Sequence, residues 1–303
     1  MRLLIIGCGS IGSRHARNAE ALGHGVVLCD PDPTRGEYPD YQTALAKERV
    51  DAAIIASPSN LHVEAANYLA EKGIPFCMEK PLATSREGLD ALLQLVEKKN
   101  VLTMMAQSFR FHEGMLEIKK MLDENLFGKP LSVVYGGGQY LPDWHPGEEY
   151  RNEYAAQKKM GGGAMFTSMS HSLDTIEWLF GTIVDYRGEK KRVGDLDIDV
   201  DDTVEISCTT TQGVKIEANA DYLQRPATHH MHIICERGTI EADFVANTIN
   251  GTPYAFDPNK RYVDELAYFV KLVERGEADK ELDLAHGAHL VDLMTDPRIT
   301  DLT

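Results

Sequence analysis

The stretch LLIIGCGSIGSRHA, residues 3–16, limits the possible folds more than any other part of the sequence. Four aliphatic residues run directly into Gly7, Gly9 and Gly12, and a helix-like segment follows. In a strand–turn–helix unit, such glycines permit a tight turn, a close approach of the backbone to a pyrophosphate, and packing of the helix on the strand. The N–H groups at the start of the helix can then bind phosphate. The motif predicts a dinucleotide-binding unit, and a tight turn without a ligand is the alternative.

Apolar runs of strand length recur through the first third of the chain, separated by amphipathic segments of helix length. The runs are residues 3–6, 26–29, 52–55, 75–78 and 101–105, and the helix-like segments are residues 10–22, 61–71 and 85–98. Strands that alternate with helices form right-handed crossovers and a parallel sheet buried on both faces. We therefore expect an α/β fold whose first domain, residues 1–120, is a doubly wound parallel sheet of the Rossmann type.

Asp30 ends the second apolar run, about 20 residues after the glycines, where such folds carry an acidic residue. A carboxylate there accepts hydrogen bonds from the ribose hydroxyls of the adenosine and repels a 2′-phosphate. The sequence therefore predicts NAD rather than NADP as the cofactor. The contacts expected in this part of the chain are Gly7, Gly9, Ser10, Ile11, Gly12, Asp30 and Arg35.

Two further loops follow the third and fourth apolar runs, at the sheet edge where doubly wound folds bind ligands. They are ASPSNLH, residues 56–62, and EKPLATS, residues 79–85. Turns that cap the next helices explain much of both loops, but they do not explain Lys80 between Glu79 and Pro81. A lysine there is placed to meet a nicotinamide or its substrate, and it can donate or accept a proton when its surroundings tune it. The cofactor contacts expected here are Ser57, Pro58, Asn60, His62, Glu79 and Lys80.

From about residue 131, strand-like runs follow one another, interrupted by one helix. The runs are residues 131–136, 184–190, 203–210, 214–220, 230–235 and 239–244, with an Asn-Gly turn signal at residues 250–251. A meander of this kind predicts a second, α+β domain, residues 121–303, with an open, mostly antiparallel sheet. A sheet face that no helix covers would be a candidate oligomer surface.

The interrupting helix is expected at residues 163–180, because its apolar residues follow a helical period. They form one stripe of Met165, Met169, Leu173, Ile176 and Phe180. The opposite side carries Thr167, His171, Asp174 and Trp178. On this pattern alone, a solvated polar face is the favoured interpretation of that side.

The composition argues against several classes of function. A net charge of -16 disfavours nucleic-acid binding, which needs clustered Lys and Arg. The five cysteines are scattered, which indicates neither a disulfide framework nor a zinc site. The acidic residues 195–202 lack the glycine and glutamate of a calcium loop, and HHMH at residues 229–232 lacks a third ligand, so no metal is expected. The apolar runs are too short to span a membrane and no signal peptide is recognisable, so we expect a cytoplasmic protein.

Several segments together resemble the glucose–fructose oxidoreductase / inositol dehydrogenase / MocA family. They are GCGSIGSRHA, ASPSNLHVEAA, MEKPLATS, FRFH, GKPLSVVYG and GGGAMFTSMSHSLDTIEWLFG, and they span most of the chain. The resemblance implies a dinucleotide-binding domain and a second domain with an open sheet, through which members assemble as homodimers or homotetramers. It also implies an NAD(P)-dependent dehydrogenase or reductase that acts on CH-OH groups, at a ring carbon of a sugar or cyclitol.

By the same resemblance, Lys80 is the catalytic lysine, and His171 and Asp174 match a histidine and an aspartate beside the substrate. The sequence departs from the family at Thr167, where members commonly carry an aspartate. A hydroxyl can orient a substrate but cannot act as a carboxylate base. Either Lys80 and His171 share the proton transfer while Thr167 orients the substrate, or the chemistry is weak or altered. The resemblance further implies a longer last helix than Pro297 allows.

Aromatic residues and arginines suggest how a substrate is bound. The segment YGGGQYLPDWHPGEEYRNEY, residues 135–154, offers aromatic faces that suit sugar rings. Arginines here, in FRFH and in DYLQRP suggest an anionic substrate, such as a nucleotide sugar or sugar acid, unless they pair with the chain's own carboxylates. The expected substrate contacts are Lys80, Arg110, Tyr140, Trp144, Arg151, Tyr154, Thr167, His171, Asp174, Tyr222 and Arg225, with Arg110 also expected at the cofactor. Two other functions stay open: an NAD-dependent lyase or hydrolase without net redox change, and a catalytically silent dinucleotide-binding sensor.

Overall fold

The structure is a computed structural model that describes all 303 residues, and the chain divides into two compact units. Unit 1 comprises Met1–Ser108 and Asn259–Leu293, and unit 2 comprises Phe109–Pro258 and Met294–Thr303. This division differs from the single boundary expected at residue 120, because the chain returns to unit 1 at residues 259–293 and ends in unit 2. The returning segment carries α7 (Lys260–Arg275), which packs against α1 (Ser10–Ala21). This contact covers the apolar side of α7.

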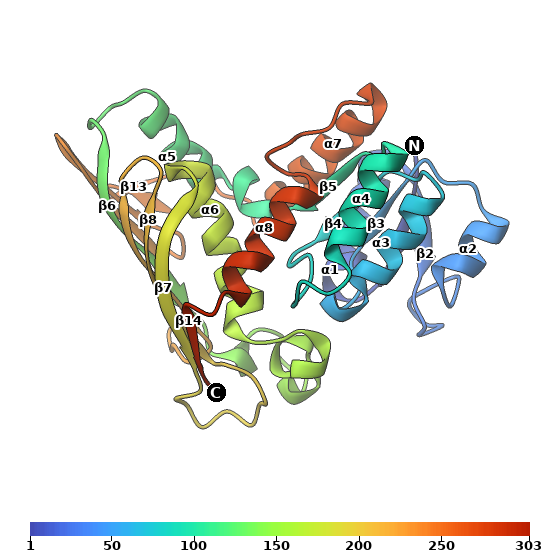
Figure 1. Cartoon of the computed structure of the whole chain (residues 1–303), viewed down its shortest axis with the longest axis horizontal. Coiled ribbons are helices and arrows are strands. Elements are labelled where there is room, and N and C mark those ends of the chain that lie inside the picture. The colour runs from blue at the N-terminus through green and yellow to red at the C-terminus, as the bar shows by residue number, and fades with distance from the viewer. The chain divides into compact units, whose positions relative to one another are not determined.

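Unit 1 contains a five-stranded parallel sheet with the strand order β2-β1-β3-β4-β5 (Figure 1). The strands are β1 (Arg2–Ile6), β2 (Gly25–Cys29), β3 (Ala52–Ile55), β4 (Phe76–Glu79) and β5 (Thr103–Ala106). Strands β3 and β5 are buried along their whole length, as the expected two-sided burial requires. The register aligns Ile6 with Cys29 and Ile55, and Ile55 with Met78. The loops after β1, β2, β3 and β4 therefore leave the sheet at the same edge.

Unit 1 also contains the three helices expected at residues 10–22, 61–71 and 85–98, and among its crossover helices the short α2 was not expected. The crossover helices are α1, α2 (Tyr41–Lys47), η1 (Ser59–Leu61), α3 (His62–Glu71) and α4 (Leu89–Lys99), and the returning segment adds α7 and α8 (Leu284–Thr295). The seven residues of α2 are too few to show a helical period. Its start is marked only by Asp40, which accepts a hydrogen bond from the backbone N–H of Thr43 at 2.6 Å.

Unit 2 is built on a nine-stranded sheet with the order β13-β12-β11-β10-β6-β9-β8-β7-β14 (Figure 1). The strands are β6 (Pro130–Gly138), β7 (Ile183–Lys191), β8 (Thr203–Thr210), β9 (Lys215–Asp221), β10 (Thr228–Cys235), β11 (Gly238–Asp243), β12 (Thr248–Ile249), β13 (Thr252–Pro253) and β14 (Ile299–Leu302). Most neighbours are antiparallel, as expected, but β6 pairs with β9 and β14 pairs with β7 in parallel. The expectation of a simple meander was wrong in this respect, because β6 lies between β9 and β10. Asn250 and Gly251 join β12 to β13 with φ angles of 49° and 72°, as the Asn-Gly turn signal predicted.

One face of this sheet carries the helices of unit 2, and the other face is open (Figure 1). The helices on the covered face are α5 (Glu113–Asp123) and α6 (Ser170–Phe180). Short helical turns lie in the connections: η2 (Ser108–Phe111), η3 (Leu141–Asp143), η4 (Tyr150–Asn152), η5 (Tyr154–Ala156) and η6 (Lys158–Met160). None of the helices in the chain combines the length and the apolar character that a membrane span needs.

The helix expected at residues 163–180 has an irregular start. One π-helical turn, η7 (Met165–Met169), precedes α6. Met165 and Leu173 are buried, as the apolar stripe predicted. The opposite side is not a solvated face, because Thr167 and Asp174 are only 3% and 1% exposed. Single π turns within helices are frequent at functional sites.

Candidate functional site

The glycine-rich turn between β1 and α1 has the geometry of a dinucleotide-binding turn. Gly7 has a φ angle of +87°, and a Cβ there would lie 2.7 Å from the backbone of Ser57. A Cβ on Gly12 would lie 1.8 Å from the carbonyl oxygen of Gly7. A Cβ on Gly9, by contrast, would project into open space, and α1 begins there without a side-chain cap. The first N–H groups of α1 are therefore available to an anion, so the turn fits a pyrophosphate.

Asp30 lies at the end of β2 and is bonded to the glycine-rich turn. Its Oδ2 accepts a hydrogen bond from the backbone N–H of Cys8 at 2.7 Å, and its Oδ1 accepts one from that of Asp32 at 2.9 Å. A carboxylate has about four acceptor positions, so Asp30 can still accept from hydroxyl groups. Arg35, in the same loop, lies 3.5 Å from the carboxylate of Asp32. The carboxylate expected to select the cofactor is thus held next to the turn.

The loops after β3 and β4 are joined by His62, the first residue of α3. Its Nδ1 lies 2.9 Å from the carbonyl oxygen of Pro81, and its Nε2 lies 2.8 Å from that of Ser57. The side chain is only 1% exposed. The imidazole expected to contact a cofactor therefore has both nitrogens engaged within the fold, whereas Asn60 in the same loop is exposed and Pro58 is half-buried.

Lys80 directly follows the last residue of β4. Burial lowers the pKa of its ammonium group to about 8, and the charge of Arg261 acts in the same direction while Glu79 opposes it. An amine with this pKa can gain or lose a proton near neutral pH, which suits general acid–base catalysis. The position of Lys80 at the end of β4 and the lowered pKa of its amine are compatible with the proton transfer that the sequence suggested.

Glu79, the last residue of β4, is held by His15 from α1. The Nε2 of His15 lies 2.8 Å from a carboxylate oxygen of Glu79, and both side chains are largely buried. Burial acts to raise the pKa of Glu79, but the hydrogen bond to His15 and the nearby positive charges outweigh it and lower that pKa. Glu265 of α7 adds a second carboxylate, and the nearest N and O atoms of the three residues lie within 4.8 Å of one another. His15 was not among the residues predicted from the sequence, although its spacing of three residues from Gly12 places both on one side of the helix.

In unit 2, the turn η2 contacts the polar side of α6. The ring of Phe109 lies against the imidazole of His171, with centroids 4.8 Å apart. The next residue, Arg110, forms a bidentate ion pair with Asp174 at 2.8 and 3.0 Å, and its guanidinium lies 6.0 Å from the ring of Trp178. The side chains of Arg110 and Asp174 are 7% and 1% exposed. Arg110 and Asp174, which were both expected to contact ligands, are therefore bonded to each other. Asp174 lies about one helical turn after His171.

Thr167 is enclosed by its own unit. Its hydroxyl donates a hydrogen bond to the carbonyl oxygen of Gly163 at 2.9 Å and lies 2.5 Å from the hydroxyl of Tyr222. Tyr222 is fully buried, and burial raises the pKa of its phenol well above the usual value. The ring of Trp144 meets that of Tyr222 edge-on at 5.2 Å. Three residues expected to contact the substrate thus form one packed cluster in unit 2.

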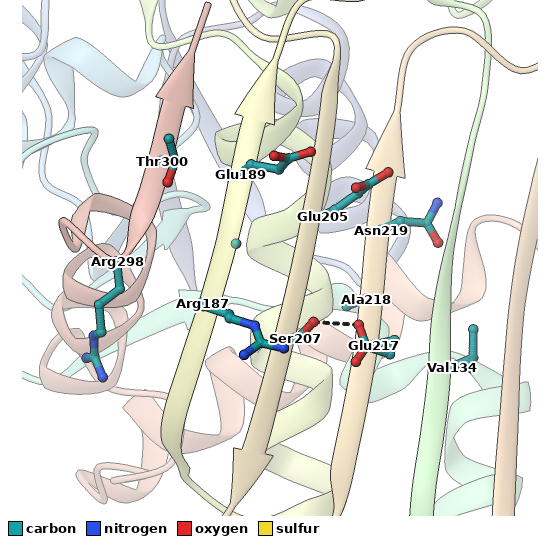
Figure 2. Close-up of a pocket in the computed structure, with 11 residues that line it drawn as sticks. Val134, Arg187, Glu189, Glu205, Ser207, Glu217, Ala218, Asn219, Arg298 and Thr300 are labelled. Atoms are coloured by element: carbon teal, nitrogen blue, oxygen red, sulfur yellow. Dashed lines mark hydrogen bonds between the residues drawn. The ribbon is translucent and has the colours of Figure 1, made fainter.

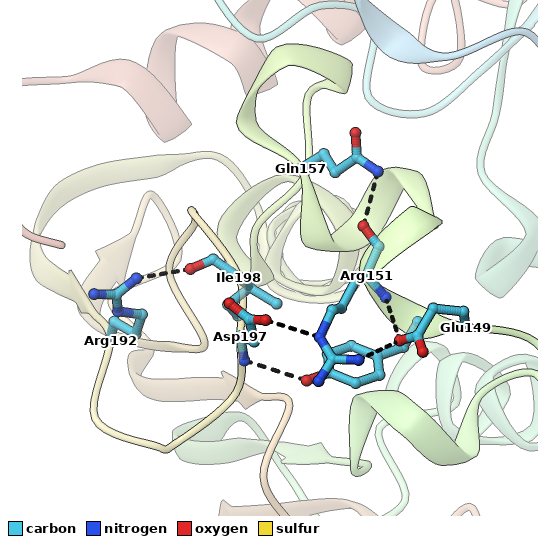
Figure 3. Close-up of polar contacts among 7 residues, drawn as sticks. Glu149, Arg151, Gln157, Arg192, Asp197 and Ile198 are labelled. Atoms are coloured by element: carbon cyan, nitrogen blue, oxygen red, sulfur yellow. Dashed lines mark hydrogen bonds and ion pairs between the residues drawn. The ribbon is translucent and has the colours of Figure 1, made fainter.

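Arg151 is bound by carboxylates of its own unit, as Figure 3 shows. Its Nε lies 2.8 Å from Asp197 and its Nη1 lies 2.8 Å from Glu149, while its carbonyl oxygen accepts a hydrogen bond from the amide of Gln157. Arg151 and Arg110 therefore both pair with carboxylates of the chain itself, which was the alternative to an anionic substrate.

Arg225 is different, because no carboxylate pairs with it. Its guanidinium carbon lies 3.7 Å from the ring centroid of Tyr140, and Arg225 is exposed. The backbone N–H of Tyr140 donates to the carbonyl oxygen of Gln224, which holds the two segments side by side. Tyr154, at the start of η5, is half-buried. Of the three arginines that suggested an anionic substrate, Arg225 alone keeps a guanidinium without a carboxylate beside it.

The two short motifs rejected as metal sites have other roles in the structure. His230 and His232 lie on the outward side of β10, while His229 lies inward with its Nε2 3.3 Å from the hydroxyl of Tyr135. In the acidic segment before β8, the carboxylate of Asp201 accepts a hydrogen bond from the N–H of Met165 at 2.7 Å and so holds the start of η7.

Comparison with known protein families gives two consecutive matches. Residues 1–107 match a family described as "Oxidoreductase family, NAD-binding Rossmann fold", and residues 115–241 match the "GFO/IDH/MocA C-terminal domain". The two matches correspond to the parallel sheet of unit 1 and to most of the sheet of unit 2.

Individual relatives point to the same family. The chain is 28% identical over 193 residues to myo-inositol dehydrogenase Hyg17 of Streptomyces leeuwenhoekii, covering 60% of this chain and 56% of that protein. It is 31% identical over 143 residues to levoglucosan dehydrogenase of Pseudarthrobacter phenanthrenivorans, covering 47% and 36%. Its fold is similar to that of the WlbA dehydrogenase from Bordetella pertussis in complex with NADH and UDP-GlcNAcA, with a TM-score of 0.82, 23% identity, and coverage of 97% and 94%.

The extent of these matches decides what they establish. The chain matches 56% and 36% of the length of the two curated relatives, so their substrates are not carried over by the match itself. The family models, however, cover the glycine-rich turn, the loops after β3 and β4, and α6, all in the expected order. This chain belongs to the Gfo/Idh/MocA family of oxidoreductases.

Proposed function

We propose that this chain is an NAD-dependent oxidoreductase that interconverts an alcohol and a carbonyl group at a ring carbon of a sugar or cyclitol. The observation that carries the proposal is Lys80, a half-buried lysine at the sheet edge that holds the glycine-rich turn, with a pKa lowered to about 8. NAD, when bound, accepts or returns the hydride. The names of the relatives, which are dehydrogenases of myo-inositol and levoglucosan, support the same reaction class.

Lys80 and His171 are the residues that we propose handle the proton. In the direction of oxidation, the neutral amine of Lys80 takes the proton from the reacting hydroxyl, and in reduction the ammonium returns it. The imidazole of His171 on α6 packs edge-on against the ring of Phe109, with centroids 4.8 Å apart. The hydroxyl of Thr167 already has partners in Gly163 and Tyr222, so we assign it support of this region rather than proton transfer.

The choice of NAD over NADP rests on Asp30. Hydrogen bonds from Cys8 and Asp32 hold its carboxylate at the end of β2. A 2′-phosphate that approached this carboxylate would bring two negative charges together, which costs several kcal/mol. A ribose with free hydroxyls could instead donate hydrogen bonds to it.

The substrate is proposed to be sugar-like, with Arg225 as the contact for any negative group. Arg110 and Arg151 already have carboxylate partners, so they support an anionic substrate less than the sequence suggested. Arg225 and Tyr140 together present a cation and an aromatic face on the surface of unit 2. This pair suits a ring that carries a carboxylate or phosphate.

We also infer that the chain forms a homodimer or homotetramer through the open face of the nine-stranded sheet. A hollow of about 560 Å³ lies on this face. Figure 2 shows the charged and polar side chains that line it, which include Arg187, Glu205 and Glu217. Val134 and Ile234 are exposed on the same face, at 44% and 45%. Exposed apolar side chains among charges of both signs are typical of surfaces that pair with another protein.

The test is the appearance of NADH absorbance when the protein is mixed with NAD and a panel of inositols, free sugars, sugar acids and nucleotide sugars. The Lys80→Ala variant is run beside the wild type, and Arg225→Gln is run on each active substrate. A signal that disappears in Lys80→Ala supports the proposal, and a selective loss on charged substrates in Arg225→Gln supports the anion contact.

Other outcomes identify the alternatives. NAD that remains bound through purification, together with substrate conversion but no net NADH, would identify a lyase or hydrolase with transient oxidation. Binding of NADH without conversion of any substrate would favour a sensor. An unchanged rate in Lys80→Ala would refute the proposed role of the lysine.

A further inference from the structure

His62 makes two contacts that a neutral histidine cannot make at the same time. Its Nδ1 lies 2.9 Å from the carbonyl oxygen of Pro81, and its Nε2 lies 2.8 Å from that of Ser57. A carbonyl oxygen only accepts hydrogen bonds, whereas a neutral imidazole has one donor nitrogen and one acceptor nitrogen. Both contacts are hydrogen bonds only when the ring carries two protons and a positive charge.

The surroundings of His62 act on this charge in opposite directions. The ring is 1% exposed, and burial, the largest influence, brings its pKa below the usual value, although backbone hydrogen bonds to Ser57, Pro81 and Leu82 and the charge of Glu79 act to raise it. Glu79 on β4 is the negative group that faces the ring, and the charge of His62 in turn helps to lower the pKa of Glu79. Lys80, between Glu79 and Pro81, is the other charged group of that loop.

The hydrogen-bond geometry opposes the effect of burial and favours the charged ring. Loss of either proton would turn one N–H contact into a lone pair facing a carbonyl oxygen at 2.8 or 2.9 Å. It would also leave a buried carbonyl group without its donor, which is costly in the interior of a protein. The negative charge of Glu79 offsets part of the cost of burying the cation.

The two acceptors belong to different loops of the candidate site. Ser57 packs on the glycine-rich turn so closely that a Cβ on Gly7 would lie 2.7 Å from its backbone. Pro81 directly follows Lys80. The imidazole of His62 therefore connects the loop that touches the glycine-rich turn to the residue next to the lysine.

A second buried histidine holds the other side of the lysine. Glu79 precedes Lys80, and its carboxylate is bonded to the Nε2 of His15 at 2.8 Å. His15 comes from α1, the helix that begins at the glycine-rich turn. Lys80 thus lies between two residues that buried histidines tie to the same part of unit 1.

We propose that His62 is a positioning residue that, as an imidazolium ion, ties the loop of Lys80 to the loop after β3. The lysine then keeps its place relative to the glycine-rich turn. This inference rests on the proposed role of Lys80 in proton transfer, but the charge of His62 is a property of the fold and is tested without turnover. It replaces the direct cofactor contact that the sequence suggested for His62.

The first experiment is nitrogen-15 NMR of the histidine side chains in the full-length, cofactor-free protein at about pH 8, where an ordinary imidazole with a pKa of about 6.5 is neutral. Among the eleven histidines, at least one is expected to keep both ring protons, and its signals are expected to be missing from the His62→Gln spectrum. If no imidazole of the wild-type protein keeps two protons, the proposal is overturned, and this result needs no variant. It is also overturned if the doubly protonated ring persists unchanged in a folded His62→Gln protein.

The second experiment separates positioning from cofactor binding. In His62→Gln, kcat is expected to fall about tenfold or more, because a small displacement of a catalytic group is costly. The pH at which turnover changes, about 8 for Lys80, is expected to move, while the dissociation constant for NADH changes by less than about twofold. The matched control is His24→Gln, because His24 lies near the N-terminal amine at the opposite edge of the sheet.

Two results of that experiment would refute the proposal. A loss of NADH affinity that matches the loss of kcat would mean that His62 binds the cofactor directly. An unchanged kcat and pH profile in the folded variant would mean that it has no positioning role. If no substrate is found, the NMR result still decides the charge of His62, so failure of the proposed reaction is distinguishable from failure of this inference.

Discussion

The buried ion pair between Arg110 and Asp174 allows a prediction of stability with a definite magnitude. Arg110→Met keeps much of the side-chain volume but leaves the carboxylate of Asp174, 1% exposed, without the guanidinium that bonds it at 2.8 and 3.0 Å. Removal of one partner from a buried ion pair costs about 3–5 kcal/mol, because the other charge stays in a poorly solvated site. We expect the free energy of unfolding of unit 2 to fall by about this amount.

Urea unfolding followed by tryptophan fluorescence measures this quantity. Both tryptophans of the chain, Trp144 and Trp178, lie in unit 2, so the signal reports that unit. The shift of the midpoint and the slope of the transition give the change in free energy. Arg151→Met is the matched control, because Arg151 is also an arginine paired with carboxylates, those of Glu149 and Asp197, but these side chains are 49–79% exposed. Its cost should stay below about 1 kcal/mol.

A double variant tests whether the unpaired charge is the cause. Arg110→Met combined with Asp174→Leu removes both charges, and an apolar pair of similar volume is often as stable as a buried ion pair. We therefore expect most of the lost stability to return. The reasoning would be refuted if Arg110→Met cost as little as Arg151→Met, or if the double variant were as unstable as the single one.

The remaining predictions concern activity, cofactor and assembly. The rate of oxidation, which needs the neutral amine of Lys80, should rise as the pH increases through about 8, and the rate of reduction, which needs the ammonium, should fall over the same range. Stopped-flow rates that do not change with pH in either direction would contradict this role. Thr167→Asp should change kcat by less than about tenfold in steady-state assays, and recovery of turnover from near zero would instead show that proton transfer was incomplete without the carboxylate. Calorimetry should give NADH an affinity at least about tenfold above that of NADPH, with Asp30→Gly narrowing the gap; equal affinities in the wild type would contradict the assignment. Light scattering should show that the wild-type protein is an oligomer and that Val134→Asp, on the open sheet face, dissociates it. The control Leu22→Asp, at an exposed position at the end of α1, should leave the oligomer intact. A monomeric wild-type protein would exclude the proposed interface.

The sheet of unit 1 was predictable because its strands are buried on both faces. Burial on two faces makes each strand a continuous apolar run, and β3 and β5 show this along their whole length. The order of strands in unit 2 was not predictable in the same way. Alternation of apolar residues marks β6 as a strand, but it does not encode that β6 pairs with β9 and β10, which follow it by many residues.

The candidate site was predictable as a set of residues but not as a set of contacts. Sequence motifs identify Lys80 and Asp174 as polar residues at positions where a polar side chain is expected to have a binding partner. A motif does not indicate whether that partner is a ligand or another side chain. In the structure, the partner of Asp174 is Arg110, 64 residues away in the chain. His15, by contrast, was not singled out by any motif. Its bond to Glu79 can be recognised only once α1 is placed beside the end of β4.

The return of the chain to unit 1 has a consequence for how the molecule is made. A ribosome that has released residues 1–108 has synthesised all five parallel strands and the loop of Lys80, but not α7. The side of α1 that α7 covers, including the hydrogen bond between Asn18 and Asn259, stays incomplete until residues 109–258 of unit 2 and then α7 have left the ribosome. The dinucleotide-binding unit is therefore the first to begin folding, but it is completed only after residues 109–258 of unit 2 have been made, and its residues 1–108 are not expected to fold fully when expressed alone.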